Sequence, residues 1–161
     1  AAQGLIRRMP SFADLINAEA DAASAFVFLL REEQEALVAG NTDALTGIVE
    51  RKAATAAALA PLSASRASAL VRHGLAGDKA GMETWLSRNP KDQAAGAAWQ
   101  RLQALATEAR ELNRVNGELI RLRMSHNAQM LEVLLAANRQ DFYGADGQTS
   151  TATPRRIIDS A

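Results

Sequence analysis

Few side chains in this sequence have the types and spacing that catalysis or metal binding requires. The chain has two histidines, His73 and His126, and no cysteine. Neither histidine stands in a Glu-x-x-His or His-x-x-x-His arrangement, the spacings that recur in zinc sites. The sequence also lacks a glycine-rich phosphate loop after a predicted strand and a Gly-x-Ser-x-Gly motif. We therefore expect a protein that is not an enzyme and has no metal and no cofactor.

The polar residues near the predicted apolar helix faces also give no indication of catalysis. Lys52, Arg66, Arg123 and His126 lie close to these faces, and we identify no carboxylates at matching positions. For His126 we expect a structural role, as a polar residue that fixes the register of a packed helix. Phosphotransfer is the alternative, because histidine phosphotransfer domains are also four-helix bundles with an exposed histidine.

The charges are balanced, with eighteen Lys and Arg against eighteen Asp and Glu. A nucleic-acid-binding protein normally carries a basic excess, so we expect no nucleic-acid partner. Two charged clusters are interpreted as solvated helix faces: the acidic run Glu32, Glu33 and Glu35, with Arg31 paired to Glu35, and the basic row Arg110, Arg114 and Arg121. An acidic partner for the basic row stays open as an alternative.

The absence of cysteine suits a reducing compartment. The longest apolar runs fall far short of the roughly 20 residues that span a bilayer, and the first residues lack the apolar stretch of a secretory signal. These features predict a cytoplasmic protein that does not insert into membranes.

Alanine, the strongest helix former, makes up roughly a fifth of the chain, and no segment alternates with the period of a strand. We predict an all-α fold, an antiparallel helical bundle or coiled-coil hairpin followed by one long C-terminal helix and a flexible tail. The first helix should cover residues 12–39, with Ser11 as N-cap and Gly40 as C-cap. The second should begin after Asn41 or Thr42, bend at residues 57–61 because of Pro61, and end near residues 74–77.

Two further helices follow in the sequence. Asp78 is a suitable N-cap for a short helix that carries Met82, Trp85 and Leu86, and Asn89-Pro90 should end it. The long last helix should run from Lys91 or Asp92 to about Asp141, on the order of 70 Å, with one end projecting from the bundle. This organisation gives a helical domain over residues 1–143 and a flexible tail over residues 144–161.

Two features of the long helix point to a partner. Residues 130–137, Met-Leu-Glu-Val-Leu-Leu-Ala-Ala, are apolar nearly all round the helix, so the segment is either enclosed on every side or keeps a face for another protein. Gly117 weakens the middle of a helix, which indicates close approach of a neighbouring helix or, alternatively, the crossing of a partner's helix.

Three stretches resemble the FlgN family of flagellar export chaperones. The first is the hairpin, from residues 30–37 through the turn at residues 40–45 to Lys52, Leu59 and Arg66. The second is Asn113-x-x-Asn116-Gly117-x-Leu119-Ile120, followed by Leu131 and Leu134. The third, Tyr143-Gly144-Ala145-Asp146-Gly147, is similar to the family's Tyr-Gly-Pro-Asp-Gly tail, with Ala145 where proline is usual. The resemblance covers about residues 12–150.

The resemblance implies a cytosolic chaperone that binds the C-terminal helical ends of the hook–filament junction proteins FlgK and FlgL and delivers them to the export gate of the flagellar type III apparatus. We expect the client helix along the last helix. Tyr143 is the expected docking residue for the export gate, with a simple helix stop at Gly144 as its alternative. Self-association as a homodimer is the alternative function. The expected client-binding residues are Leu119, Ile120, Leu122, Met124, Met130, Leu131, Leu134 and Leu135.

Overall fold

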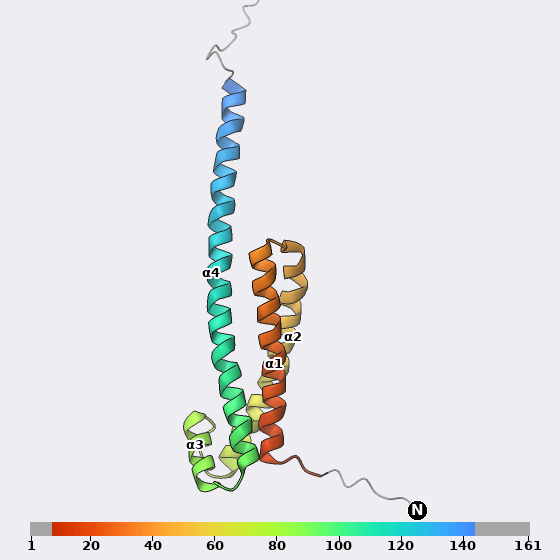
Figure 1. The fold of residues 1–161 in the computed structure, drawn as a ribbon, viewed down its shortest axis with the longest axis vertical. Coiled ribbons are helices and arrows are strands. Elements are labelled where there is room, and N and C mark those ends of the chain that lie inside the picture. Colours follow the sequence, from red (N-terminus) through yellow and green to blue (C-terminus); the bar gives the residue numbers. More distant parts are fainter. Residues whose placement is uncertain (1–7, 144–161) are drawn as a thin grey trace, which may run out of the picture. The chain divides into compact units, whose positions relative to one another are not determined.

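The computed structural model describes the backbone of residues 8–143 and the side chains of residues 8–139, and every regular element in this range is helical. The helices are α1 (Phe12–Ala39), α2 (Thr42–Arg72), α3 (Lys79–Arg88) and α4 (Gln93–Tyr143) (Figure 1). The predicted all-α class is therefore confirmed. The predicted tail, residues 144–161, lies outside the described residues, so its flexibility and the domain boundary before it stay predictions.

Side-chain caps define the ends of α1. The Ser11 hydroxyl accepts a hydrogen bond from the backbone N–H of Asp14 at 3.1 Å, and the Ser11 N–H donates to the Asp14 carboxylate at 2.8 Å. This capping box satisfies two N–H groups at the helix end, and the bond from the Ser11 backbone lowers the pKa of the Asp14 carboxyl. At the other end, Gly40 adopts the left-handed conformation with φ of 72°. Both predicted caps are confirmed.

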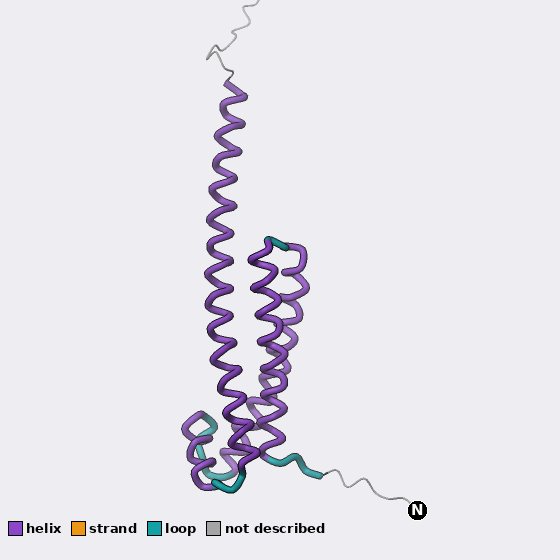
Figure 2. The backbone as a smooth tube through the Cα atoms, in the orientation of Figure 1, coloured by secondary structure: helices purple, strands orange, loops and turns teal. Residues whose placement is uncertain are grey.

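The turn between α1 and α2 consists of Gly40 and Asn41 alone, and the Asn41 side chain caps α2 by accepting from the N–H of Ala44 at 3.3 Å. So short a turn makes α1 and α2 an antiparallel hairpin (Figure 2). Helix α2 continues through Pro61, whose ring is exposed. The bend predicted there stays a prediction.

Side chains also cap the first turns of α3 and α4. The Asp78 carboxylate accepts from the N–H of Gly81 at 2.9 Å and the Asp92 carboxylate from the N–H of Ala95 at 3.0 Å. Asn89 caps the end of α3, as predicted. The predicted ends of α1, α3 and α4 agree with the structure to within about two residues, which is the scatter expected between boundary definitions, whereas α2 ends at Arg72, before the predicted residues 74–77.

Two buried ion pairs fix how α1 and α2 face each other. Arg66 binds Glu19 through two bonds, Nε to Oε2 at 2.7 Å and Nη2 to Oε1 at 3.2 Å, and the Lys52 ammonium binds the Glu33 carboxylate. Glu19 and Glu33 are 14 residues apart, as are Lys52 and Arg66, so both pairs belong to one antiparallel register. Our expectation that Lys52 and Arg66 lack matching carboxylates is therefore wrong, and so is the expectation that Glu33 is solvated.

The hydrophobic core lies where α1 begins, α2 ends and α4 begins, with α3 packed beside them (Figure 1). The rings of Phe12 and Trp85 are 4.4 Å apart between centroids, and the guanidinium of Arg66 lies 5.1 Å from the ring centroid of Trp99. Arg66 thus joins an ion pair within the hairpin to a cation–π contact with α4. The buried core residues are Ala13, Ile16, Ala20, Leu70, Met82, Trp85, Ala95, Ala98, Trp99 and Leu102.

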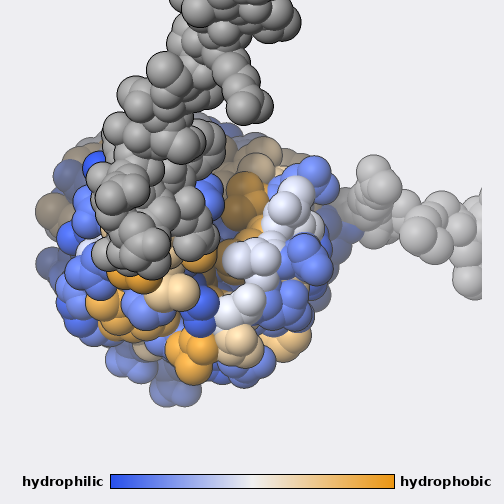
Figure 3. All heavy atoms as spheres, turned by 90° about the horizontal axis from the view of Figure 1, so that it is seen from above, coloured by the Kyte–Doolittle hydropathy of each residue, from blue (hydrophilic) through white to orange (hydrophobic). Residues whose placement is uncertain are grey.

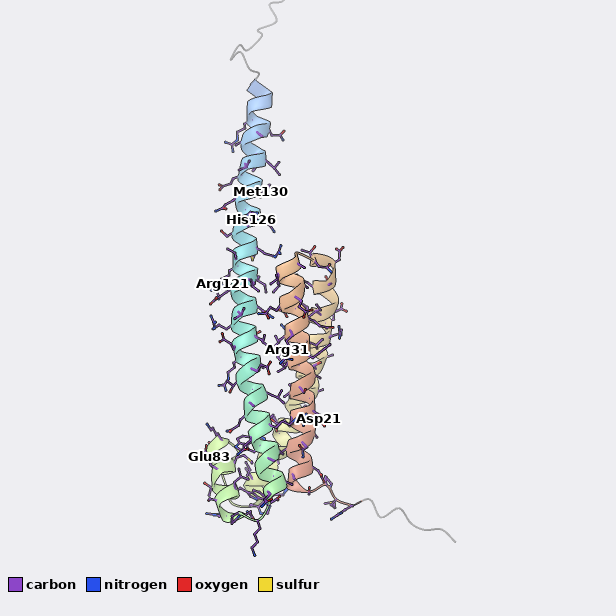
Figure 4. The ribbon with its side chains drawn as sticks, in the orientation of Figure 1. Asp21, Arg31, Glu83, Arg121, His126 and Met130 are labelled. Atoms are coloured by element: carbon purple, nitrogen blue, oxygen red, sulfur yellow. The ribbon has the colours of Figure 1, made fainter. Side chains whose placement is uncertain are left out.

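The first part of α4 runs alongside α1 (Figure 4). The Asn116 side chain donates to the Leu30 carbonyl at 2.8 Å, Arg101 pairs with Asp21 at 2.8 Å, and Arg31 pairs with Glu108. The expected pairing of Arg31 with Glu35 on the same helix is therefore wrong. The chain divides at Ile120 into two compact units, residues 1–120 and residues 121–161, and the second contains the rest of α4.

Candidate protein-binding surface on the last helix

The part of α4 that belongs to the second unit exposes large apolar side chains. All residues from Arg121 to Arg139 are exposed except Arg123, which is half-buried. Leu131, Leu134 and Leu135 have exposed fractions of 57, 63 and 48%. Leu122, Met124, Met130 and Val133 are also exposed. Figure 3 shows, from above, hydrophobic residues at the surface between hydrophilic ones.

The spacing of these residues places them on a broad arc of the helix. Met124, Leu131 and Leu135 recur at steps of seven and four residues and share one line of the helix, with Leu134 beside it. Met130 and Val133 lie on the adjoining side. An ordinary surface helix has an apolar stripe of roughly 100° that its own fold covers. Here the stripe is wider and exposed, which is typical of a surface that binds another protein.

Polar residues of the same segment lie both within the arc and outside it: Asn127 and Asn138 are seven residues from Leu134 and Leu131 and share their lines of the helix. Arg121, Ser125, Glu132 and Arg139 recur at steps of four and seven residues and form one polar line. No residue of this line can face an apolar partner without losing its hydration, so the partner must approach from the apolar arc.

The eight predicted client-binding residues do not all have the same environment. Leu119 is half-buried in the first unit, and Ile120, also in that unit, is exposed. The other six lie in the second unit and are exposed. Val133 belongs to the same exposed set although our list omitted it; its place in the heptad row of the helix would have revealed it. Tyr143 is the last residue of α4, and its side chain lies outside the described residues.

The structural role expected of His126 is wrong, because its side chain is exposed (Figure 4). The buried polar residue of α4 is Asn116 instead, with 1% of its surface exposed. The hydrogen bond that its side-chain amide donates to the Leu30 carbonyl fixes α4 against α1, which is the role that the sequence suggested for the histidine.

The close approach expected at Gly117 is also wrong. A Cβ built on this glycine would meet no atom within 4 Å outside its immediate chain neighbourhood. Of the two interpretations, only the crossing of a partner's helix stays open.

Gly117→Ala should therefore stabilise the free protein by about 0.5–1 kcal/mol, because alanine is the better helix former and has room here. Thermal unfolding followed by circular dichroism measures the change. A lower melting temperature would show that the glycine conformation itself is required. Weaker client binding by this more stable variant would instead support a partner helix crossing at Gly117.

Arg114, in the part of α4 that belongs to the first unit, is paired within its own helix. Arg114 binds Glu111 and Glu118, with the shortest bond to each at 2.6 Å. These bonds raise the pKa of Arg114 and lower that of Glu111, as expected for an exposed helix face. Among the described residues no three His, Cys, Asp or Glu side chains come together as metal ligands. In the same part of the chain, no helix is long and apolar enough to cross a membrane.

An all-helical fold with an exposed apolar arc on its last helix is typical of the class of proteins that act by binding other proteins. The family model described as FlgN protein matches residues 9–151. The flagella synthesis protein FlgN of Yersinia enterocolitica is 28% identical over 127 residues, which are 78% of this chain and 80% of that protein. The proteins of the same name from Salmonella typhimurium and Escherichia coli are 41% and 38% identical over 54 and 53 residues, about a third of this chain and 39% and 38% of theirs. No solved structure matches.

The chain belongs to the FlgN family. Membership confirms the family resemblance found in the sequence and with it the predicted class, a flagellar export chaperone.

Proposed function

We propose that this protein is a cytoplasmic chaperone that binds the C-terminal helices of FlgK and FlgL and delivers these clients to the flagellar export gate. The observation that carries the proposal is the exposed apolar arc of α4 between Leu122 and Leu135. Fully burying a leucine side chain contributes about 1.5–3 kcal/mol, so several such residues support specific binding. An amphipathic client helix is the partner that an apolar arc with a polar line behind it fits best.

The width of the arc determines the mode of binding. Met124, Leu131 and Leu135 on one line contact one client helix, while Met130 and Val133 on the adjoining side are free for a second. Burying both sides would shield apolar client surface that otherwise associates before export. A second copy of the chaperone is the competing occupant of the same arc.

Titration calorimetry of the chaperone with the C-terminal segments of FlgK and FlgL tests the proposal. We expect saturable binding with a negative heat-capacity change, the mark of apolar burial. Matched client segments without their terminal helices should give no heat. Light scattering of the free chaperone and of the complex measures how many copies each contains. Absence of binding by both clients, or a free dimer that clients do not dissociate, would contradict the proposal.

Export-gate docking is assigned to Tyr143, at the end of α4. An aromatic side chain buries a large apolar area and has few rotamers to lose, which makes it an effective anchor. Tyr143→Ala should leave client affinity unchanged and reduce gate affinity by at least about tenfold, or about 1.4 kcal/mol.

Binding of the purified cytoplasmic domain of the gate, measured by biolayer interferometry, provides the comparison. Phe142→Ala is the matched control, because it removes the neighbouring aromatic ring from the same helix turn. If Tyr143→Ala weakens client and gate binding equally, the two partners do not use separate surfaces.

A further inference from the structure

The α1–α2 hairpin carries a groove on a face that α4 does not line. A hollow of about 450 Å³ near the turn has Ala36, Ala44 and Ile48 among its lining residues. A second hollow of about 350 Å³ lies further along, lined in part by Phe28 and Ala54. Arg51 lines both hollows, so they are neighbours on the same face of the hairpin. We call the two hollows together the hairpin groove; its lining residues lie within residues 25–39 of α1, at the N-cap Asn41 and within residues 42–55 of α2.

The groove has the dimensions of a helix-binding site. Its α1 wall covers 15 residues, or roughly 21 Å along the helix axis, which is the length of a four-turn helix. Gly47 lies on its α2 wall, exposed and in mid-helix, and a Cβ built there would meet no atom within 4 Å. Phe28 is 56% exposed beside the second hollow. Small residues in the groove and an exposed aromatic ring at its edge suit the close approach of another helix.

The charges around the groove define what can enter it. Glu35 of α1 and Asp43 and Glu50 of α2 are exposed and form no ion pair within residues 8–139. Asp43, Gly47 and Glu50 are spaced by four and three residues and lie on one side of α2. The two carboxylates therefore lie one turn before and one turn after Gly47, which has no side chain. The one cation of the groove, Arg51, is held by Glu32 at 2.9 Å. We call Glu35, Asp43 and Glu50 the rim carboxylates: Glu35 lines the first hollow, and Asp43 and Glu50 lie next to Gly47 along α2 without lining either hollow.

We propose that the hairpin groove binds a basic amphipathic helix of a partner protein, at a site separate from the client surface on α4. Lysine or arginine side chains on the flanks of that helix pair with the rim carboxylates, and its small apolar residues pack over Gly47 and Ala44. Phosphate-bearing partners, whether nucleic acids or anionic membranes, are repelled by the same carboxylates. Two copies of this chain facing each other through their grooves would bring like charges together, which disfavours a symmetric dimer there.

A panel of three labelled peptides tests the proposal by fluorescence anisotropy with the full chain. Each peptide is a 15-residue helix with the same alanine and leucine ridge, flanked by lysine, glutamine or glutamate. We expect the lysine peptide to bind best and the glutamate peptide not to bind. Addition of 0.5 M NaCl should weaken the affinity for the lysine peptide by about tenfold or more, because exposed charges are screened. Equal affinities across the panel would overturn the proposal, as would no binding of the lysine peptide.

Matched variants locate the site. Gly47→Trp fills the groove and should abolish binding of the lysine peptide, whereas Val49→Trp, two residues away on the other side of α2 and also exposed, should not. Glu35→Lys with Glu50→Lys should reverse the preference to the glutamate peptide, and Glu83→Lys with Glu118→Lys makes the same charge change elsewhere without this effect. Binding that survives Gly47→Trp would overturn the assignment. A labelled second copy in place of the peptide should not bind, and a groove-dependent dimer seen by light scattering would replace the partner helix with this chain itself.

Discussion

Replacing Leu131 and Leu134 by aspartate should weaken client binding by two orders of magnitude or more. Both side chains are exposed in the free protein, so the change leaves the fold intact, but in the complex it places two charges in an apolar interface. Burying an unpaired carboxylate costs several kcal/mol, and tenfold in affinity corresponds to about 1.4 kcal/mol. Titration calorimetry with the FlgK C-terminal segment measures the loss.

The chain offers a control with the same change in charge. Ser125→Asp with Arg139→Gln makes the net charge two units more negative on the polar line of the same helix segment, where the new side chains stay hydrated. We expect this variant to bind the client with an affinity within about threefold of the original. If both double variants bind equally well and both melt as the parent protein does, the apolar arc is not the client surface.

Arg66→Met should destabilise the first unit by about 3–5 kcal/mol, the usual cost of leaving one charge of a buried pair without its partner. The Arg66 and Glu19 side chains are 11 and 7% exposed, and the guanidinium also contacts the Trp99 ring. The single change therefore removes a bidentate ion pair between α1 and α2 and the cation–π contact with α4. Urea denaturation followed by circular dichroism gives the free energy of unfolding.

Two comparisons separate burial from charge. Arg51→Met breaks the exposed pair with Glu32 in the same hairpin and should cost at most about 1 kcal/mol. Glu19→Met combined with Arg66→Met removes both buried charges and should recover much of the stability lost by Arg66→Met alone, because no unpaired carboxylate remains. Equal losses for Arg66→Met and Arg51→Met would show that burial of the pair does not matter.

These pairs also explain why the hairpin has one register. Alanine-rich helices offer many nearly equivalent ways of sliding past each other, since small side chains interlock weakly. Moving α2 by one turn would separate both Glu19 from Arg66 and Glu33 from Lys52, leaving two buried carboxylates and two half-buried cations without partners. The two pairs therefore select the observed alignment even if apolar residues of the same size would be as stable.

Local sequence patterns were enough to define the helices and most of their ends. Ser11, Gly40, Asp78 and Asn89 act through bonds to residues three or four positions away, so their effect can be read without knowing the fold. The apolar arc of α4 could be predicted in the same way, because the residues around a helix follow from the sequence alone, but its exposure was left open. The family resemblance was also contained in local motifs.

Which polar side chains are covered depends on how the helices pack against one another. His126 and Asn116 both lie near the apolar stripe of α4, but Asn116 is opposed by the Leu30 carbonyl of α1 and His126 is exposed. Glu19 and Glu33 meet Arg66 and Lys52 across the hairpin, 47 and 19 residues apart in the chain. Periodicity gives the face of a helix on which a residue lies; whether another helix covers that face depends on contacts between distant segments, which no local pattern contains.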